Sequence, residues 1–305
     1  MTGLSQAEIE SLLSYTNGLM HHVYWVSEDF CLCPEKDHLA TSINFTDISE
    51  RRTDFLFELI TTINSWVYGK EKVKKLVDER VTECGGDIAN ASAFLTSLAF
   101  SKFRPGYPQG QFGELLLFNF LQYFFKSIPL LRKQRISTSV GHERYGADAV
   151  HYRRDGDDNI LILGESKCYK SNYQFKNAFE TSIRSIEKTF NEFNNELNLY
   201  VYDDFIEPEL EVVAKRYKKG TLSNVKFELV CVVAYNENMN ISGATEEEIK
   251  SNIINVIKNR CSSIDKDIYN EMVPGVLSRI NYIIFPIWDL ESLLSEFQTK
   301  IGATV

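Results

Sequence analysis

Residue types that mark fibrous, disulfide-rich or membrane-spanning proteins are scarce in this sequence. Its 305 residues include only 7 prolines and 16 glycines, which excludes a collagen-like repeat and a proline-rich linker. Six dispersed cysteines are too few for a disulfide scaffold and fit a reducing cytoplasm. No apolar run approaches the ~18 residues of a membrane helix, and the first residues have neither the basic nor the apolar part of a secretory signal. We therefore expect a globular cytoplasmic protein that does not use a membrane.

Positive charge is also scarce overall, because 33 Lys and Arg face 42 Asp and Glu and give a net charge of −9. The distribution is uneven: residues 1–100 carry 8 basic against 15 acidic side chains, residues 101–190 carry 14 against 9, and residues 191–305 carry 11 against 18. A phosphate backbone would bind best to the basic middle third, although segment charge also varies by chance. The candidate contacts to such a backbone in this third are Arg132, Lys133, Arg135, Arg144, Lys170 and Lys176.

The first hundred residues carry helical patterns joined by irregular segments. Ser5 followed by Glu8 forms a capping box in front of an apolar-periodic run, which predicts the start of a helix. Apolar spacing predicts a second helix over 54–67 and a third that begins after Asp87 and ends at residue 100. A short strand is expected near 22–26.

Two prolines and two glycines in RPGYPQGQ (104–111) mark the clearest internal break in the chain. We predict a mostly helical region at 1–103, which is a candidate for binding a partner, and a second domain at 104–305. The elements expected in the second domain are a helix at 112–125, strands at 132–140, 145–154 and 158–169, a helix at 175–199, a strand at 225–235, a helix at 246–260, a strand at 282–287 and a helix at 289–301.

The order of these elements predicts the fold class. Asp155-Gly156 is a hairpin signal, so the two strands that flank it are expected to pair antiparallel. The long amphipathic helix that follows allows a crossover, and the strand at 225–235 would then lie parallel to an earlier strand. We therefore predict an α/β protein with a mixed sheet and helices on both faces.

Four charged residues stand where the pattern predicts burial. Asp148 lies inside a strand pattern, Glu165 and Lys167 end a nearly unbroken apolar strand, and Glu114 lies in the first turn of the apolar helix. Alternate residues of a strand share a face, so Glu165 and Lys167 should point the same way, and the hairpin brings Asp148 alongside them. A buried charge is costly unless it is paired or binds a metal ion. The sequence therefore predicts a cluster of acidic side chains and one lysine at one end of two strands.

Such a cluster suits metal-assisted hydrolysis of a phosphodiester. Carboxylate oxygens bind Mg²⁺ or Mn²⁺, which lowers the pKa of a water molecule and stabilises charge on the phosphate, and a lysine ammonium can orient that water. Each residue also has a plainer explanation. Glu165 and Lys167 could form a solvated ion pair at a strand end, Asp148 could cap a turn, and Glu114 could interact with the helix dipole.

The spacing of these residues resembles the PD-(D/E)xK nuclease superfamily. Asp148 is followed, after sixteen intervening residues, by Glu165-Ser166-Lys167 on a hairpin flanked by helices. The resemblance implies a restriction-endonuclease-like core. In such a core Asp148, Glu165 and the backbone carbonyl of Ser166 would hold the metal ion, Lys167 would assist the attacking water, and Glu114 would join from the preceding helix.

A closer resemblance, over residues 100–290, is to the HamA family, the nuclease subunit of the Hachiman anti-phage defence system. It rests on GELL (113–116), YGADAV (145–150) and ILGESK (162–167) in this order. Ala147 departs from the superfamily signature, which has proline at this place. The resemblance implies a metal-dependent deoxyribonuclease that acts on DNA together with a HamB-like superfamily-2 helicase. The alternative is a non-catalytic DNA- or protein-binding subunit on the same fold.

Overall fold

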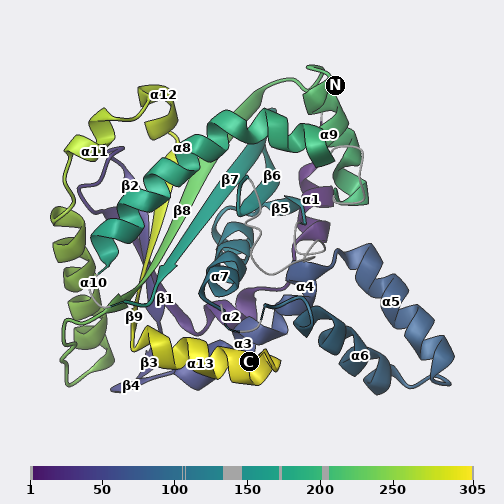
Figure 1. The fold of residues 1–305 in the computed structure, drawn as a ribbon, viewed down its shortest axis with the longest axis horizontal. Helices are drawn as coiled ribbons and strands as arrows, with labels where there is room; N and C mark the ends of the chain where they lie inside the picture. Colours follow the sequence, from purple (N-terminus) through teal and green to yellow (C-terminus); the bar gives the residue numbers. More distant parts are fainter. Residues whose placement is uncertain are drawn as a thin grey trace.

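The computed structural model describes residues 3–104, 106, 108–132, 146–171, 174–200 and 206–303. Within these residues, seven strands form one mixed sheet in the order β1-β2-β9-β8-β7-β6-β5 (Figure 1), and β3 and β4 pair separately. The strands are β1 (Val23–Asp29), β2 (Asp37–Ile43), β3 (Phe45–Thr46), β4 (Ser49–Glu50), β5 (Ile128–Leu131), β6 (Ala149–Asp155), β7 (Asp158–Tyr169), β8 (Val225–Glu237) and β9 (Ile280–Trp288).

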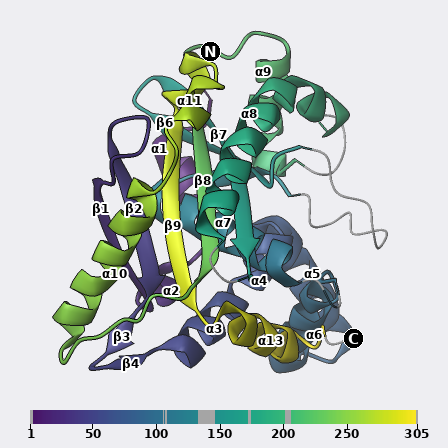
Figure 2. The same ribbon diagram turned by 60° about the vertical axis from the view of Figure 1, so that its left-hand side comes forward.

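Helices cover both faces of this sheet (Figures 1 and 2). One face is covered by α8 (Phe175–Tyr200) and α10 (Glu246–Ser262), and the other by α3 (Arg52–Thr61), α7 (Pro108–Phe124) and α13 (Leu290–Ile301). The remaining helices are α1 (Gln6–Leu12), α2 (Asn17–Met20), α4 (Ile63–Val67), α5 (Lys70–Glu83), α6 (Ile88–Phe100), α9 (Glu211–Lys218), α11 (Asp267–Asn270) and α12 (Pro274–Leu277). No helix in the described part of the chain is long and apolar enough to cross a membrane. The predicted α/β class, with a mixed sheet between helices, is confirmed.

The central strands alternate between two apolar cores, one on each face of the sheet. Along β8, one core receives Leu229, Cys231, Val233 and Tyr235, and the other receives Val230, Val232 and Ala234. Both sets are buried because helices cover both faces. This two-sided burial explains why the sequence of the strand is an almost continuous apolar run.

The predicted hairpin joins β6 and β7 antiparallel. Asp155 lies opposite Asp158 next to the turn, and Ala149 lies opposite Gly164 at the open end. Gly156 has a φ of +57°, a left-handed conformation that glycine adopts at little cost. β7 pairs parallel with β8, and β8 pairs parallel with β9. Parallel neighbours need long crossovers, and α8 and α10 lie in these connections.

Two boundaries near the middle of the chain differ from the sequence prediction. α7 begins at Pro108, one turn before the expected residue 112, because proline is accommodated in the first turn of a helix. β5 occupies Ile128–Leu131, where the sequence pattern predicts no strand. The strand expected at 132–140 lies, except for Arg132, outside the described residues.

The N-terminal region contributes two strands to the same sheet. Its capping box is confirmed, because Glu8 N–H donates to Ser5 Oγ (3.3 Å) and Ser5 N–H donates to Glu8 Oε2 (2.7 Å). The strand expected near 22–26 is β1, whereas β2 is an addition that pairs parallel with β9. The sheet therefore contains strands from both predicted regions, 1–103 and 104–305. The division of the chain into these two regions stays a prediction.

The other N-terminal helices follow the sequence pattern with one interruption. Asp87 is the N-cap of α6, and its carboxylate accepts a hydrogen bond from Asn90 N–H (3.0 Å). The helix expected over 54–67 is divided into α3 and α4 at Thr62. The Thr62 hydroxyl donates to the Leu59 carbonyl (2.7 Å), and back-bonding of this kind bends helices.

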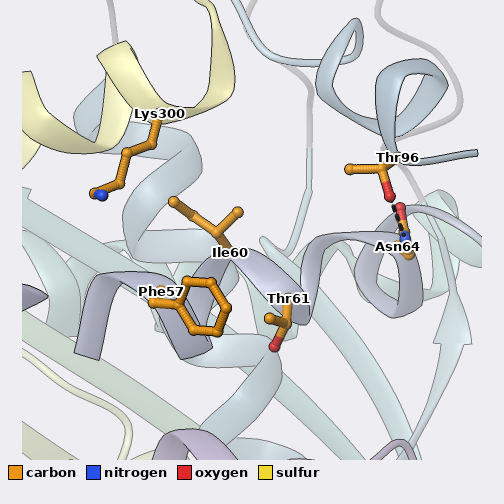
Figure 3. Close-up of a pocket in the computed structure, with 6 residues that line it drawn as sticks. All are labelled: Phe57, Ile60, Thr61, Asn64, Thr96 and Lys300. Atoms are coloured by element: carbon orange, nitrogen blue, oxygen red, sulfur yellow. Dashed lines mark hydrogen bonds between the residues drawn. The ribbon is translucent and has the colours of Figure 1, made fainter. Parts of the chain in front are cut away.

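A pocket of about 380 Å³ opens among α3, α4, α6 and α13 (Figure 3). Its lining residues are Phe57, Ile60, Thr61, Asn64, Thr96 and Lys300. These side chains include one cation and no carboxylate, so the pocket offers no carboxylate ligand for a divalent metal ion. None of the charged residues singled out in the sequence lines it.

Candidate active site

β6 and β7 bring the predicted acidic residues together at the open end of their hairpin. Asp148 directly precedes Ala149, the residue of β6 that lies opposite Gly164 of β7. Glu165 directly follows Gly164 on β7, so Asp148 lies next to Glu165, although Asp148 stands one residue before β6 and not, as expected, inside the strand. Its position beside Glu165 is the one that the hairpin signal and the strand register predict.

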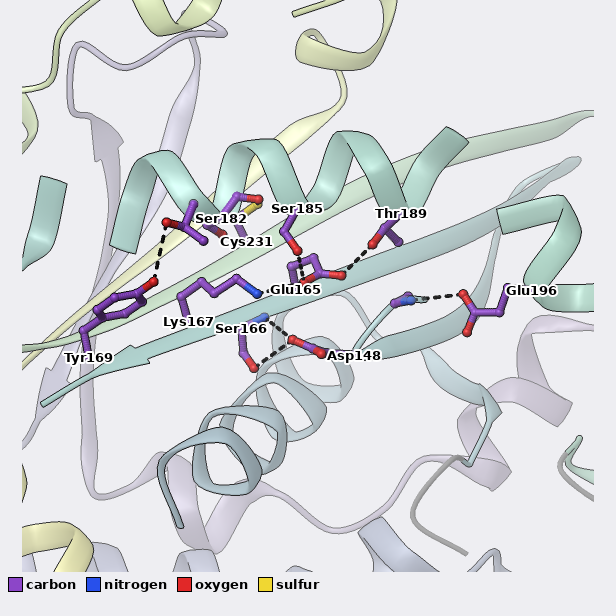
Figure 4. Close-up of polar contacts among 12 residues, drawn as sticks. Asp148, Glu165, Ser166, Lys167, Tyr169, Ser182, Ser185, Thr189, Glu196 and Cys231 are labelled. Carbon is purple, nitrogen blue, oxygen red and sulfur yellow. Dashed lines mark hydrogen bonds and ion pairs between the residues drawn. The ribbon is translucent and has the colours of Figure 1, made fainter. Parts of the chain in front are cut away.

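Glu165 is a buried carboxylate that several hydrogen-bond donors hold. Its side chain is only 3% exposed. Thr189 Oγ1 donates to Glu165 Oε1 (2.6 Å), Ser185 Oγ donates to Oε2 (2.8 Å), and Lys167 Nζ lies 3.3 Å from Oε2 (Figure 4). This burial excludes the explanation that Glu165 belongs to a solvated ion pair at a strand end. The contact between Glu165 and Lys167 agrees with their expected position on one face of β7.

Asp148 is held from the neighbouring strand. Ser166 donates both its backbone N–H (2.8 Å) and its hydroxyl (3.2 Å) to Asp148 Oδ2 (Figure 4). The backbone just before Asp148 is fixed separately, because Ala147 N–H donates to Glu196 Oε2 on α8 (3.0 Å). Gly146 precedes this point with a φ of +100°. Among the described residues, the hydrogen bonds of Asp148 run across the strand pair instead of capping its own turn.

The cluster contains more negative than positive charge. Burial, together with the carboxylates of Glu165 and Glu114, raises the pKa of Asp148 from 3.8 to about 8. Burial by itself would lower the pKa of Lys167, but the charges of Asp148 and Glu165 outweigh it and hold that pKa above its ordinary value. Lys167 is therefore a permanent cation, and one lysine does not relieve the repulsion among the carboxylates. A bound divalent cation would relieve it.

Glu114 approaches the cluster from α7. The helix begins at Pro108, so Glu114 lies in its second turn and not, as predicted, in the first. Its charge contributes to the raised pKa of Asp148. α7 and β7 approach closely here, because a Cβ added at Gly113 would lie 3.2 Å from Ser166 Oγ. The helix-dipole explanation of Glu114 fails, since that effect is confined to the first turn.

The cluster offers oxygen ligands of the kind that Mg²⁺ and Mn²⁺ prefer. Within the described ranges, no group of three or more His, Cys, Asp or Glu side chains is arranged to hold a metal ion. Mg²⁺ commonly needs only one or two carboxylates, because waters and substrate phosphates complete its coordination. Asp148 and Glu165 supply two, and the carbonyl of Ser166, which directly follows Glu165, is a third oxygen. The chemistry of these donors, together with the burial and the neighbouring carboxylates that raise the pKa of Asp148, fits a divalent cation.

Among the predicted DNA contacts, Arg132 is wrong, because it is buried inside the fold. Only 6% of its side chain is exposed, and its guanidinium contacts Glu207 and the backbone carbonyls of Ser65 and Trp66. A buried cation requires such partners and cannot also face a DNA backbone. Lys170 and Lys176 are exposed and stay predictions, whereas Lys133, Arg135 and Arg144 lie outside the described residues.

Helix α8 supplies residues of the cluster that the sequence analysis missed. Ser185 and Thr189 donate to Glu165, and Glu196 accepts from the backbone before Asp148. α8 is recognisable from its apolar periodicity, and Thr189 is buried within that apolar stripe. A hydroxyl at such a position is the signal that could have identified it.

Two carboxylates and a lysine lie at the open end of a hairpin, in the mixed sheet of an α/β protein whose helices cover both faces. The chain belongs to the HamA family, whose sequence model matches residues 20–301. The resemblance inferred from the motifs is confirmed, and the chain is a nuclease-like protein of a defence system. Among solved structures it is similar to the restriction endonuclease FokI, with 11% identity and a TM-score of 0.25. The match covers 69% of this chain and 28% of the FokI chain, so this chain spans less than a third of FokI. A search of curated proteins gave no match.

Proposed function

We propose that this protein is a divalent-metal-dependent deoxyribonuclease that hydrolyses DNA phosphodiesters in anti-phage defence. The observation that carries the proposal is the cluster of Asp148, Glu165 and Lys167, in which carboxylates that repel each other lie beside a charged lysine. Asp148, Glu165 and the Ser166 carbonyl, joined by Glu114, would hold Mg²⁺ or Mn²⁺. When bound, the ion would activate a water molecule and stabilise negative charge on the phosphate.

Lys167 acts in this proposal as a hydrogen-bond donor and not as a base. Its raised pKa keeps the ammonium protonated at neutral pH. About a fifth of the side chain is exposed, so the ammonium lies at the edge of the buried cluster. From there it can donate to the attacking water or to a phosphate oxygen that gains charge, and a fixed donor of this kind lowers the barrier.

A HamB-like superfamily-2 helicase is the proposed partner, and the cytoplasm is the proposed location. Family membership supports the partner. Residues 1–100 and 191–305 carry more acidic than basic side chains, and this negative charge repels the DNA backbone. The charge supports a role for the partner in delivering DNA to this protein. We therefore expect the complex to leave intact circular DNA uncut without ATP. Free degradation of such DNA without ATP would contradict this restraint.

Cleavage of plasmid and linear DNA by the protein with its helicase partner and ATP, with Mg²⁺ or Mn²⁺ and with EDTA, tests the activity. Glu165→Gln preserves the shape of the side chain and removes its charge, and it should lower the rate about 100-fold or more. Glu247→Gln changes an exposed glutamate in the first turn of α10 and is the matched control, which should cleave like the wild type. Equal cleavage by Glu165→Gln would contradict the proposal. DNA binding without cleavage by the wild type would favour the non-catalytic binding subunit.

A further inference from the structure

The orientation of Glu165 depends on α8. Thr189 Oγ1 and Ser185 Oγ donate to different oxygens of the Glu165 carboxylate, at 2.6 and 2.8 Å (Figure 4). Ser185 and Thr189 are four residues apart, so the two hydroxyls approach the carboxylate from one side of the helix. A carboxylate held at both oxygens cannot rotate about its last bond without breaking a hydrogen bond. The helix therefore fixes the plane of the Glu165 carboxylate.

Packing alone does not require a hydroxyl at Thr189. The residue is 4% exposed, and it lies between Ile186 and Phe193 in the apolar stripe that packs against the sheet. Valine would occupy almost the same volume there without a polar atom to satisfy. Helical Ser and Thr commonly bond to the carbonyl one turn earlier, yet the Ser185 and Thr189 hydroxyls donate across to Glu165.

The same helix also contacts the strand that carries the other carboxylate. Glu196 Oε2 accepts from Ala147 N–H at 3.0 Å, immediately before Asp148. Glu196 is itself buried, and it follows Thr189 by seven residues, two turns along the same side of α8. One helix thus orients Glu165 directly and holds the backbone that leads into Asp148.

We propose that Ser185 and Thr189 are positioning residues, whose hydroxyls orient the Glu165 carboxylate for binding a divalent cation. The inference rests on the proposed function and adds to it the part of the fold that shapes the metal site. Partners that orient a metal ligand from outside typically contribute about 10–100-fold to metal affinity or activity. The hydroxyls should therefore affect how tightly the cation binds, in addition to any effect on stability.

Binding of Mn²⁺ to the purified full chain without DNA, followed by electron paramagnetic resonance of the free ion, tests this inference. Thr189→Val removes the hydroxyl and keeps the shape, and Ser185→Ala removes the second donor. Each should weaken Mn²⁺ binding, and the double variant should weaken it about 10–100-fold. Thr189→Ser retains the hydroxyl and should restore binding close to that of the wild type. Ser182→Ala is the matched control, because Ser182 is a fully buried α8 hydroxyl that makes no hydrogen bond to Glu165 among the described contacts, and its Mn²⁺ binding should be unchanged.

Melting temperatures in EDTA, measured in parallel, separate positioning from stability. If Thr189→Val and Ser185→Ala lower only the melting temperature and leave Mn²⁺ affinity unchanged, the hydroxyls are structural and the inference is overturned. Equal weakening by Ser182→Ala, or a wild type that binds no Mn²⁺, also overturns it. If Mn²⁺ binding depends on both hydroxyls but the wild type with its partner never cleaves DNA, the proposed nuclease activity fails while the positioning of Glu165 stands.

Discussion

Replacement of Asp148 by asparagine should stabilise the metal-free protein at pH 8 and at the same time abolish cleavage. Burial and the carboxylates of Glu165 and Glu114 raise the pKa of Asp148 to about 8, from 3.8. The pKa of Asp148 is higher in the folded than in the unfolded protein. The stability that this carboxyl group contributes is therefore fully present below pH 3.8 and is lost as the pH rises through 8. Asparagine does not ionise, and its side-chain oxygen can still accept the hydrogen bond from Ser166 N–H.

The size of the effect follows from the shift in pKa. About four pKa units at 1.36 kcal/mol each give an upper limit of about 5 kcal/mol at pH 8. For a chain of 305 residues, 1 kcal/mol corresponds to a change in melting temperature of about 2 °C. In EDTA at pH 8, Asp148→Asn should therefore melt up to about 10 °C above the wild type. The two melting temperatures should converge as the pH falls towards 4.

Thermal melting from pH 4 to pH 8, in EDTA and in Mg²⁺, checks this prediction. Mg²⁺ should raise the melting temperature of the wild type, because a ligand that binds the folded state stabilises it. It should have little effect on Asp148→Asn, which has lost a carboxylate of the proposed metal site. The variant could instead melt below the wild type in EDTA at pH 8, or its melting temperature could depend on pH as that of the wild type does. Either result would mean that Asp148 is a structural hydrogen-bond acceptor and not a carboxylate whose ionisation destabilises the fold.

The remaining predictions concern the lysine, one buried ion pair and two histidines. Lys167→Ala should lower the cleavage rate about 100- to 1,000-fold, a barrier increase of about 3–4 kcal/mol, while Mn²⁺ binding persists. A cleavage rate within tenfold of the wild type would contradict the role of Lys167 as a hydrogen-bond donor in the reaction. Arg132→Ala should lower the free energy of unfolding in urea by about 3–5 kcal/mol, because it removes the cation that faces the buried Glu207; an unchanged midpoint would refute this assignment. Burial lowers the pKa of His38 to about 4 and that of His151 to about 3. The stability they contribute is present above pH 6.5 and lost as the pH falls through these values. Asp148→Asn removes the opposing titration of Asp148, so a melting temperature of this variant that stays constant from pH 7 to pH 4 would count against the burial of both histidines as neutral rings.

Local patterns in the sequence were sufficient to predict the strands that build the cluster. The Asp155-Gly156 turn and the apolar runs on either side of it predict the antiparallel pairing of β6 and β7. That register places Asp148 beside Glu165, and strand alternation places Lys167 on the face of Glu165. Turn preference and side-chain alternation are properties of neighbouring residues, so a single sequence contains them.

The tertiary structure alone decided which charges are buried and what holds them. Arg132 belongs to a basic segment, but its guanidinium is enclosed by Glu207 and by backbone carbonyls of α4, more than sixty residues away along the chain. Thr189 has the pattern of an ordinary helical residue until packing brings it to Glu165, 24 residues earlier. Partners so far apart in the chain meet only when helices pack against the sheet, and no local pattern of residues specifies that contact.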